Sequence, residues 1–324
     1  MKTTIEDIEI MSAKTQLRLF GFEEYFNSFI KLYEKNELPN SMLLSGPKGL
    51  GKSTFAYHII NYLLSKNEEK KYSVEDFVID ETNLSYKFLT TNTHPNFFLI
   101  ENNLLEKDIK IEQVRNLLKF LSKSTYTRNL KIVMIDNAEN LNLNSSNALL
   151  KAIEEPQKHT FFFIIHNSAS KILDTVKSRC TEFKFALNIS QKKNIFAKII
   201  MQYKSKFNIN EITENYYFDT PGNLVKYFLT LNKANISIKE NTLKCIFYFI
   251  EKYKKEKSPD TLSFLSLFIE KFYHELCLGN NKNLNSYFFN LSKILKQIDE
   301  MKKFNLDEKN IFIWIKDILQ NEAK

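Results

Sequence analysis

One eight-residue stretch, Gly46 to Ser53, limits the fold of this chain more than any other feature. It satisfies the pattern G-x-x-x-x-G-K-[ST], whose two glycines are Gly46 and Gly51, and it has a further glycine at Gly49. Glycine lets backbone N–H groups turn inward and approach a phosphate without a Cβ in the way. Lys52 is then expected to reach phosphate oxygens, and the Ser53 hydroxyl to bind Mg²⁺. The pattern therefore predicts a phosphate-binding loop, and its position between a strand and a helix disfavours a glycine-rich turn of no consequence.

Short apolar runs alternate with helical patterns through the first half of the chain. The run Ser41–Ser45 leads into the loop as a buried parallel strand would, and residues 52–64 continue as a helix. Strands that alternate with helices predict a parallel sheet with right-handed crossovers. Residues 66–92 are polar and irregular, and no element is predicted there. The other predicted strands are Phe97–Ile100, Ile132–Ile135, Phe161–Ile165 and Glu182–Phe185, and the other predicted helices are 22–36, 111–122 and 146–155.

Beyond about residue 186 the strand pattern fades and helical periodicity replaces it. The whole chain contains only 6 Gly and 6 Pro, which favours long, uninterrupted helices. A length of 324 residues suits two or three domains. The chain is thus predicted to have an α/β front and an all-helical back. The predicted helices of the back are 190–206, 221–232, 239–254, 259–278, 283–301 and 308–322.

Composition sets broad limits on partners and setting. The net charge of +8 suits a phosphate-rich partner such as nucleic acid, and a solvated, lysine-rich surface is an equal alternative. Cys180, Cys245 and Cys277 are too few and too scattered for a disulfide framework or a metal site, which indicates a reducing, cytoplasmic setting. The charged N-terminus does not read as a signal peptide. No apolar run reaches the length of a membrane span.

A second element of a phosphate site is the apolar run that ends in Asp136. A hydrophobic strand followed by Asp is the Walker B arrangement, whose carboxylate holds Mg²⁺ and its water shell. Asn137 follows, where an active ATPase of this type usually has the Glu that activates water, and an amide cannot act as a general base. Glu139 lies three positions after Asp136 and is expected to point elsewhere, although rescue of the activity by Glu139 stays open.

The order and spacing of five motifs resemble those of bacterial clamp loader subunits of the AAA+ superfamily. Within that family the chain is most similar to the delta prime type of DNA polymerase III subunit. The resemblance covers about residues 20–185, and the helical remainder agrees with it in length and class without a motif of its own. The five motifs are Gly46–Ser53, His94–Asn96, Ile135–Asp136, Asn147–Pro156 and Ser178–Cys180.

This resemblance implies an α/β P-loop (AAA+) parallel-sheet domain over residues 1–186, a helical lid over 187–235, and an all-α C-terminal collar over 236–324. It implies a hetero-oligomeric ring with other clamp loader subunits, which loads the sliding clamp on primer–template DNA, and no membrane partner. Arg179 takes the role of an arginine finger that acts in trans on a neighbour's nucleotide. The implied ligand is ATP or ADP with Mg²⁺, where Ser53 and Asp136 hold the metal and the nucleotide-binding residues are Gly46, Gly49, Gly51, Lys52, Ser53, Thr54, Asp136 and Asn167.

The chain departs from the family's ATPase subunits in three ways. Asn137 replaces the catalytic Glu, and Asp219–Val225 lacks the nucleotide-sensing Arg of a Gly-x-x-Arg stretch. Residues 66–92 contain no cysteine, so the zinc module found in many relatives is not expected. Asn167 takes the sensor position, whereas His166 is expected to be structural. These departures predict a subunit that binds ATP weakly or passively and hydrolyses it poorly.

Other functions stay open at this point. The alternative within the fold is a catalytically active clamp loader ATPase of the gamma/tau type. A stand-alone P-loop enzyme would need acceptor-binding residues that the sequence does not offer, and no groove-reading module supports a pure DNA-binding protein. Arg115 and Lys151, on helices that face the duplex in the family, are candidates for phosphate contacts, but Lys151 is equally suited to a solvated surface.

Overall fold

The computed structural model describes residues 11–102, 108–123, 130–203, 219–236, 241–279, 283–304 and 306–323. By compactness these residues fall into two units. The described residues up to Val225 form the first unit, and those from Lys226 onward form the second. The division runs through one helix, α8 (Pro221–Lys233). The predicted three-domain division into 1–186, 187–235 and 236–324 stays a prediction.

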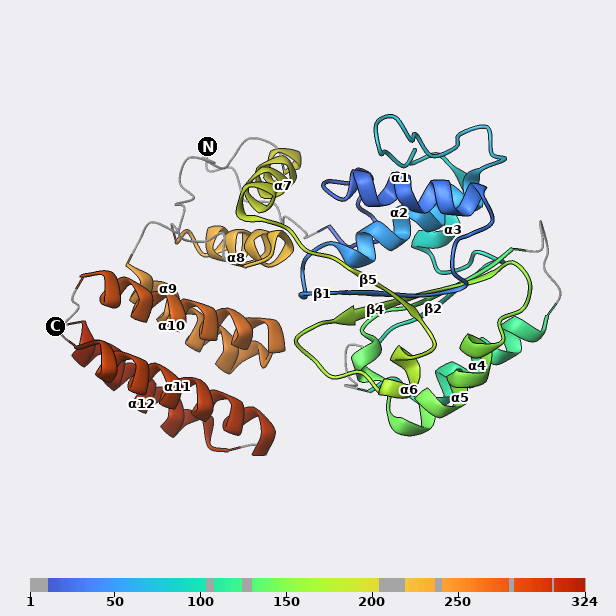
Figure 1. Ribbon diagram of the computed structural model, residues 1–324. Coiled ribbons are helices and arrows are strands. Elements are labelled where there is room, and N and C mark those ends of the chain that lie inside the picture. Colours follow the sequence, from blue (N-terminus) through green and yellow to red (C-terminus); the bar gives the residue numbers. More distant parts are fainter. Residues whose placement is uncertain are drawn as a thin grey trace. The chain divides into compact units, whose positions relative to one another are not determined.

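The first unit is built on a five-stranded sheet in the order β2-β3-β4-β1-β5, in which every pair is parallel. Figure 1 shows this sheet edge-on between two helical layers. All residues of β1 and β3 are buried, because helices cover both faces of a parallel sheet. The strands are β1 (Ser41–Gly46), β2 (Phe97–Ile100), β3 (Lys131–Ile135), β4 (Thr160–Asn167) and β5 (Thr181–Lys184).

Two separate hydrophobic cores flank the sheet. Successive side chains of a strand point to opposite faces, so Met42 and Leu44 enter one core and Leu43 enters the other. The first core lies under α1 (Glu23–Glu34), α2 (Lys52–Ser65) and α3 (Leu84–Thr90), and the second under α4 (Ile111–Ser122), α5 (Leu143–Glu154) and α6 (Asp174–Lys177). This arrangement confirms the predicted α/β layering.

Helix α3 lies in the segment for which the sequence predicted no element. The side chain of Asn83 caps its start by accepting a hydrogen bond from the Tyr86 N–H. The carboxylate of Glu68 accepts further bonds from the N–H groups of Leu84 and Ser85, at 2.8 and 3.0 Å. A seven-residue helix is too short to give a clear periodic pattern, and one of its caps, Glu68, lies 16 residues before Leu84. The sequence pattern therefore missed it.

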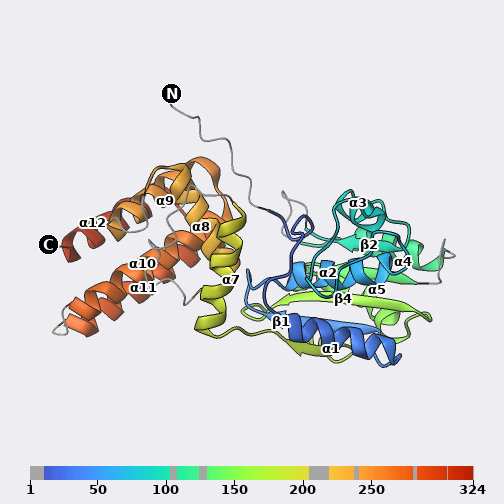
Figure 2. The ribbon, with the colours of Figure 1, turned by 90° about the horizontal axis from the view of Figure 1, so that it is seen from above.

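The remaining helices confirm the predicted all-helical back. Helix α7 (Ile189–Gln202) belongs to the first unit, whereas α9 (Thr242–Glu256), α10 (Pro259–Gly279), α11 (Leu284–Phe304) and α12 (Glu308–Glu322) form the second. Each of these four packs on the next in sequence, and α12 also contacts α9. Figure 2 shows α10 and α11 lying side by side. Residues 204–206 and 239–240, which were predicted to be helical, lie outside the described residues.

The predicted elements agree with the structure closely at their ends. Helix 111–122 and strand 97–100 are reproduced without change, and helix 146–155 begins three residues earlier, at Leu143. Its earlier start follows from Asn142, whose side chain accepts a hydrogen bond from Ser145 N–H as an N-cap. Over the residues that are described, the helices are too short or too polar to cross a membrane.

Candidate functional site

The glycine loop joins the carboxyl end of β1 to the start of α2. Gly49 and Gly51 adopt φ values of +79° and +101°, a region that side-chain-bearing residues rarely enter. A Cβ on Gly46 would lie 2.7 Å from the carbonyl oxygen of Phe185. No described heavy atom lies within 4 Å of the Cβ position of Gly51, so the loop is open on that side. The loop thus has the left-handed turns and the open cradle that a phosphate group requires.

Lys52 lies at the centre of this loop. Its ammonium donates hydrogen bonds to the carbonyl oxygens of Gly46 and Pro47, both at 2.7 Å. Only 5% of the residue is exposed, and burial lowers the pKa of Lys52 to about 8, against the opposing effect of the Glu139 and Asp136 charges. A buried cation with neutral partners is poorly compensated. A phosphate would supply the full negative charge that these carbonyls lack.

Ser53 and Asp136 come together from two different elements. The Ser53 hydroxyl, in the first turn of α2, lies 3.1 Å from each carboxylate oxygen of Asp136, which follows β3. Burial raises the pKa of the Asp136 carboxyl, while the bonds from Ser53 and from Asn137 N–H oppose that rise. Hard oxygen donors at one point beside a phosphate loop fit Mg²⁺, which keeps waters and phosphate oxygens as its other ligands. Thr54 follows Ser53 in the same turn and is half-buried.

The described residues contain no group of three or more His, Cys, Asp or Glu side chains suited to hold a metal ion. A Mg²⁺ ion at this site would therefore depend on Ser53, on Asp136 and on the nucleotide itself. The expectation of no zinc stays a prediction.

Glu139 does not point away from the site, and that expectation was wrong. Asn137 adopts a left-handed conformation with φ of +56°, and the 3₁₀ turn η1 (Ala138–Asn140) follows it. This turn brings the Glu139 carboxylate to the end of β4, where it accepts a hydrogen bond from the Asn167 N–H at 3.1 Å. Its charge raises the pKa values of Lys52 and Asp136. A second carboxylate therefore belongs to the site.

Asn167 lies beside the start of the glycine loop, because the register of β4 on β1 pairs it with Gly46. Its side-chain oxygen accepts from Ala169 N–H at 3.2 Å, and its amide nitrogen lies 3.4 Å from the Ser170 hydroxyl. The neighbouring His166 is buried, with ring nitrogens 3.4 Å from the Ser45 hydroxyl and 3.0 Å from the Ser170 carbonyl. The position of Asn167 suits a sensor of the bound group, and the bonds of His166 suit a structural role.

Arg179 is far from the loop in its own chain. It lies two residues before β5, whose register pairs Thr181 with Met42 at the amino end of β1. Met42 precedes Gly46 by four strand residues, roughly 13 Å at the usual rise, and Arg179 lies in the turn before β5. Its Nε donates to the Glu154 carboxylate at 2.8 Å, and its Nη1 donates to the Thr175 carbonyl at 3.0 Å. The structure thus brings together the other predicted site residues at the carboxyl ends of the strands and leaves Arg179 at the amino ends.

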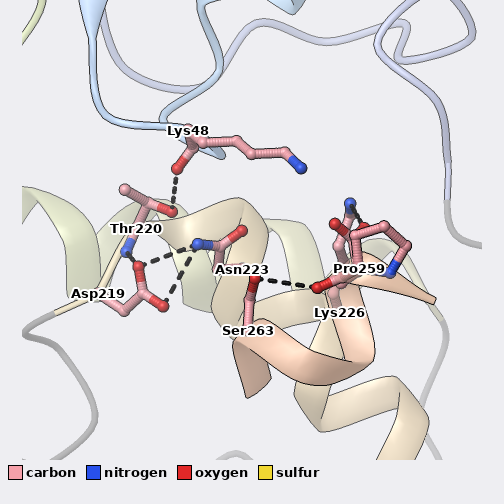
Figure 3. A network of polar contacts seen from close by, with 8 residues as sticks. Lys48, Asp219, Thr220, Asn223, Lys226, Pro259 and Ser263 are labelled. Carbon is pink, nitrogen blue, oxygen red and sulfur yellow. Dashed lines mark hydrogen bonds and ion pairs between the residues drawn. The ribbon is translucent and has the colours of Figure 1, made fainter. Parts of the chain in front are cut away.

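The start of α8 also touches the loop, which the sequence did not predict. The Thr220 hydroxyl donates to the Lys48 carbonyl at 2.8 Å, and the Gly222 N–H donates to the Gly49 carbonyl at 2.9 Å. Figure 3 shows the Thr220 side chain directed at the Lys48 carbonyl, with Asp219 and Asn223 beside it. The presence of a glycine at 222, in a chain with only 6, was the one available sign.

The fold and the loop define the class of this protein. A five-stranded parallel sheet in which β4 separates the loop strand from the Asp136 strand, followed by a helical region, is an AAA+ fold of the P-loop class. The chain belongs to the family described as "DNA polymerase III, delta subunit", whose sequence model matches residues 21–188. The predicted AAA+ fold and clamp loader family are therefore confirmed.

Individual relatives agree with this family. The chain is 34% identical over 143 residues to the DNA polymerase III subunit delta' of Pseudomonas aeruginosa. The matched region covers 44% of this chain and 42% of the relative. It is 27% identical over 219 residues to the subunit gamma of Buchnera aphidicola, which covers 65% of this chain and 57% of that one. The chain thus spans about half the length of these relatives.

A solved structure supports the fold over nearly the whole chain. A DNA polymerase III gamma subunit-related protein of Thermotoga maritima matches with a TM-score of 0.50 and 16% identity, which covers 92% of this chain and 99% of that one. At this identity the likeness concerns the fold alone.

Proposed function

We propose that this chain is a delta prime-type subunit of the DNA polymerase III clamp loader, which binds ATP or ADP with Mg²⁺ passively and supplies Arg179 to a neighbouring subunit. It assembles with other clamp loader subunits, through the helices of its second unit as a collar, and helps to load the sliding clamp on primed DNA. Such a role takes place at the chromosome, so a cytoplasmic location follows from it. Membership of the family supports the assembly role.

Passive nucleotide binding is supported by the presence of phosphate and Mg²⁺ ligands and by the replacement of two residues that promote hydrolysis. Lys52, Ser53 and Asp136 form a phosphate and Mg²⁺ site. The residue after Asp136 is Asn137, whose amide cannot take a proton from water. The segment Asp219–Val225 supplies no Arg toward the loop. The site therefore has parts that bind the ligand, while two parts that promote hydrolysis are replaced.

The position of Arg179 is the observation that carries the trans role. Arg179 lies near the amino ends of the strands, whereas Gly46–Ser53 follows the carboxyl end of β1. A side chain cannot span that separation, so Arg179 cannot serve the chain's own nucleotide. Its Nε and one Nη are held by Glu154 and Thr175, which leaves the other Nη to meet an acceptor outside the chain. A guanidinium at a subunit boundary suits the charge that develops on a transferred phosphoryl group.

The test is the ATPase of the reconstituted clamp loader with primed DNA and clamp. In Arg179→Ala, the catalytic site that this residue serves should lose activity on the order of 10³-fold, the usual contribution of an arginine finger. The variant's own nucleotide affinity should stay at the wild-type value. Lys177→Ala is the matched control, because Lys177 is a nearby exposed cation that pairs with Glu182. Equal ATPase rates in wild-type and Arg179→Ala complexes would overturn the trans role.

One observation favours a second candidate, a catalytically active ATPase. The Glu139 carboxylate lies at the Asn167 end of β4 and acts electrostatically on Lys52, so it is a carboxylate of the site in addition to Asp136. If Glu139 activates water, the purified chain should hydrolyse ATP, and Glu139→Gln should abolish that activity while Asn137→Ala leaves it unchanged. No turnover in the wild-type chain would leave the passive role as the better account.

DNA contacts are proposed from surface charge and from the positions of two helices. Arg115 on α4 and Lys151 on α5 are both exposed, and the net charge of +8 favours phosphate-rich partners. The start of α5 is capped by Asn142, and N–H groups at a helix start bind phosphate well. Replacing either cation with alanine should weaken primed-DNA binding by the complex and reduce its salt dependence.

A further inference from the structure

The outer side of the phosphate loop is held by the first turn of α8. Thr220 Oγ1 donates to the Lys48 carbonyl at 2.8 Å, and Gly222 N–H donates to the Gly49 carbonyl at 2.9 Å. All four residues belong to the same compact unit. Thr220 is only 4% exposed, so its hydroxyl has little access to water as an alternative partner. The contact is thus a built feature of this unit.

Two glycines allow the backbones to approach this closely. A Cβ on Gly222 would lie 2.6 Å from the Gly49 carbonyl oxygen. A Cβ on Gly49 would lie 2.5 Å from Thr220 Oγ1 and 2.7 Å from Asn223 Oδ1. Real Cβ atoms do not come so near to other heavy atoms, so a larger residue at 222 must push the two backbones apart. A larger residue at 49 must displace the Thr220 and Asn223 side chains and adopt an unfavourable positive φ.

Asp219 and Asn223 fix the shape of the segment that makes the contact. Asp219 Oδ1 accepts hydrogen bonds from Thr220 N–H at 2.6 Å and from the Asn223 amide at 3.1 Å. Figure 3 shows these three residues joined, with Thr220 reaching across to Lys48. A segment held by its own side chains can hold the loop with little further loss of conformational entropy.

Both bonds to the loop use its carbonyl oxygens and none of its N–H groups. A phosphate binds to the N–H groups of such a loop, so the contact and a bound phosphate do not compete for the same atoms. Lys52 acts in the same sense, because it bridges the Gly46 and Pro47 carbonyls. The protein therefore holds the loop by its carbonyl oxygens, and neither contact from α8 uses the N–H groups that bind phosphate.

We propose that Thr220 and Gly222 are positioning residues that hold the phosphate loop in its binding conformation whether or not a nucleotide is present. We call residues 219–223 the clasp of the loop. The role of the clasp in ligand binding rests on the proposed nucleotide-binding function. The start of α8 contacts the loop itself, at the Lys48 and Gly49 carbonyls. Loss of the clasp should free the loop and weaken nucleotide binding, because the loop must then be ordered when the ligand binds.

The test uses trypsin cleavage after Lys48 in the full chain without nucleotide. Lys48 is exposed, but its carbonyl, which trypsin must attack, is the group that Thr220 holds. Cleavage of a folded chain follows the population of the locally open state. Thr220→Val removes the donor without changing the shape, and the cleavage rate should rise about fivefold, as expected for one hydrogen bond. Gly222→Ala should raise it further.

Two matched controls accompany these variants. Thr220→Ser keeps the hydroxyl, and Gly279→Ala places a Cβ where no described heavy atom lies within 4 Å, so both should be cleaved at the wild-type rate. Wild-type rates after Lys48 in both Thr220→Val and Gly222→Ala would overturn the clasp.

A titration with Mg²⁺ and fluorescent ADP separates the clasp from the proposed function. If the wild-type chain binds and Thr220→Val binds about fivefold more weakly, the clasp positions the loop for its ligand. If the wild-type chain does not bind while the cleavage differences persist, nucleotide binding fails as a function and the clasp stands as a structural contact. Equal affinities in wild type and Thr220→Val would overturn its positioning role.

Discussion

Lys52 should make the stability of this protein rise with pH in the alkaline range. Burial lowers the pKa of Lys52 from 10.5 to about 8 in the folded chain. The unfolded chain therefore binds more protons between pH 8 and pH 10.5, and the free energy of unfolding must increase with pH in that window. Below pH 8 the folded chain carries the free-energy penalty of a buried, protonated amine. Above pH 10.5 the amine is neutral in both states and this penalty is absent.

The size of the effect follows from the same two values. A pKa difference of this size corresponds to roughly 3 kcal/mol, at 1.36 kcal/mol for each pH unit. The bonds to Gly46 and Pro47, both at 2.7 Å, stabilise the ammonium and reduce the figure, so a gain of about 1–3 kcal/mol is expected. In a unit of this size that gain raises the Tm by about 2–4 °C for each kcal/mol.

The assay compares urea denaturation of the wild type and Lys52→Met at pH 7 to 10.5, followed by far-UV circular dichroism. Fluorescence is unsuitable, because the single tryptophan, Trp314, lies in α12 of the other unit. Wild type should gain stability relative to Lys52→Met between pH 8 and pH 10.5. Ser53→Ala, which alters the same loop but keeps Lys52, should follow the wild-type profile. A constant difference between wild type and Lys52→Met at all pH values would refute the reasoning.

Two further predictions concern titratable groups away from the loop, the buried His58 and the half-buried Cys180. Burial lowers the pKa of His58 to about 4, below its ordinary 6.5, so between these values the unfolded chain binds a proton that the folded chain does not. The free energy of unfolding should therefore fall by roughly 3 kcal/mol as the pH drops from 6.5 to 4. In His58→Gln this acid-induced loss should be smaller, and an acid profile equal to that of the wild type would contradict the prediction. Burial raises the pKa of the Cys180 thiol to about 12, so at pH 8 iodoacetamide should alkylate it roughly 10³-fold more slowly in the folded than in the urea-unfolded chain. Mass spectrometry of the Cys180 peptide measures this ratio, and equal rates would show that the thiol is not buried.

The local pattern of the sequence predicted most of the fold because its signals lie within short windows. The glycine loop, the apolar runs and the helical periodicity each extend over fewer than about 20 residues, and burial on both faces of a parallel sheet makes each strand stand out. The strand Phe97–Ile100 and the helix Ile111–Ser122 were therefore predicted at their observed limits. Helix α3 was missed because one of its caps, Glu68, lies 16 residues from Leu84.

The sequence by itself determined that this chain has a phosphate loop, a Walker B aspartate and no Glu directly after it. Only the tertiary structure decided how the residues around them are used. Glu139 meets Asn167 across 28 residues, and Thr220 meets Lys48 across 172. Such pairs depend on strand order and on a left-handed turn at Asn137, which no local spacing encodes. The strand register also places Arg179 at the end of the sheet opposite the loop, because the amino ends of parallel strands all lie at one end of the sheet and their carboxyl ends at the other.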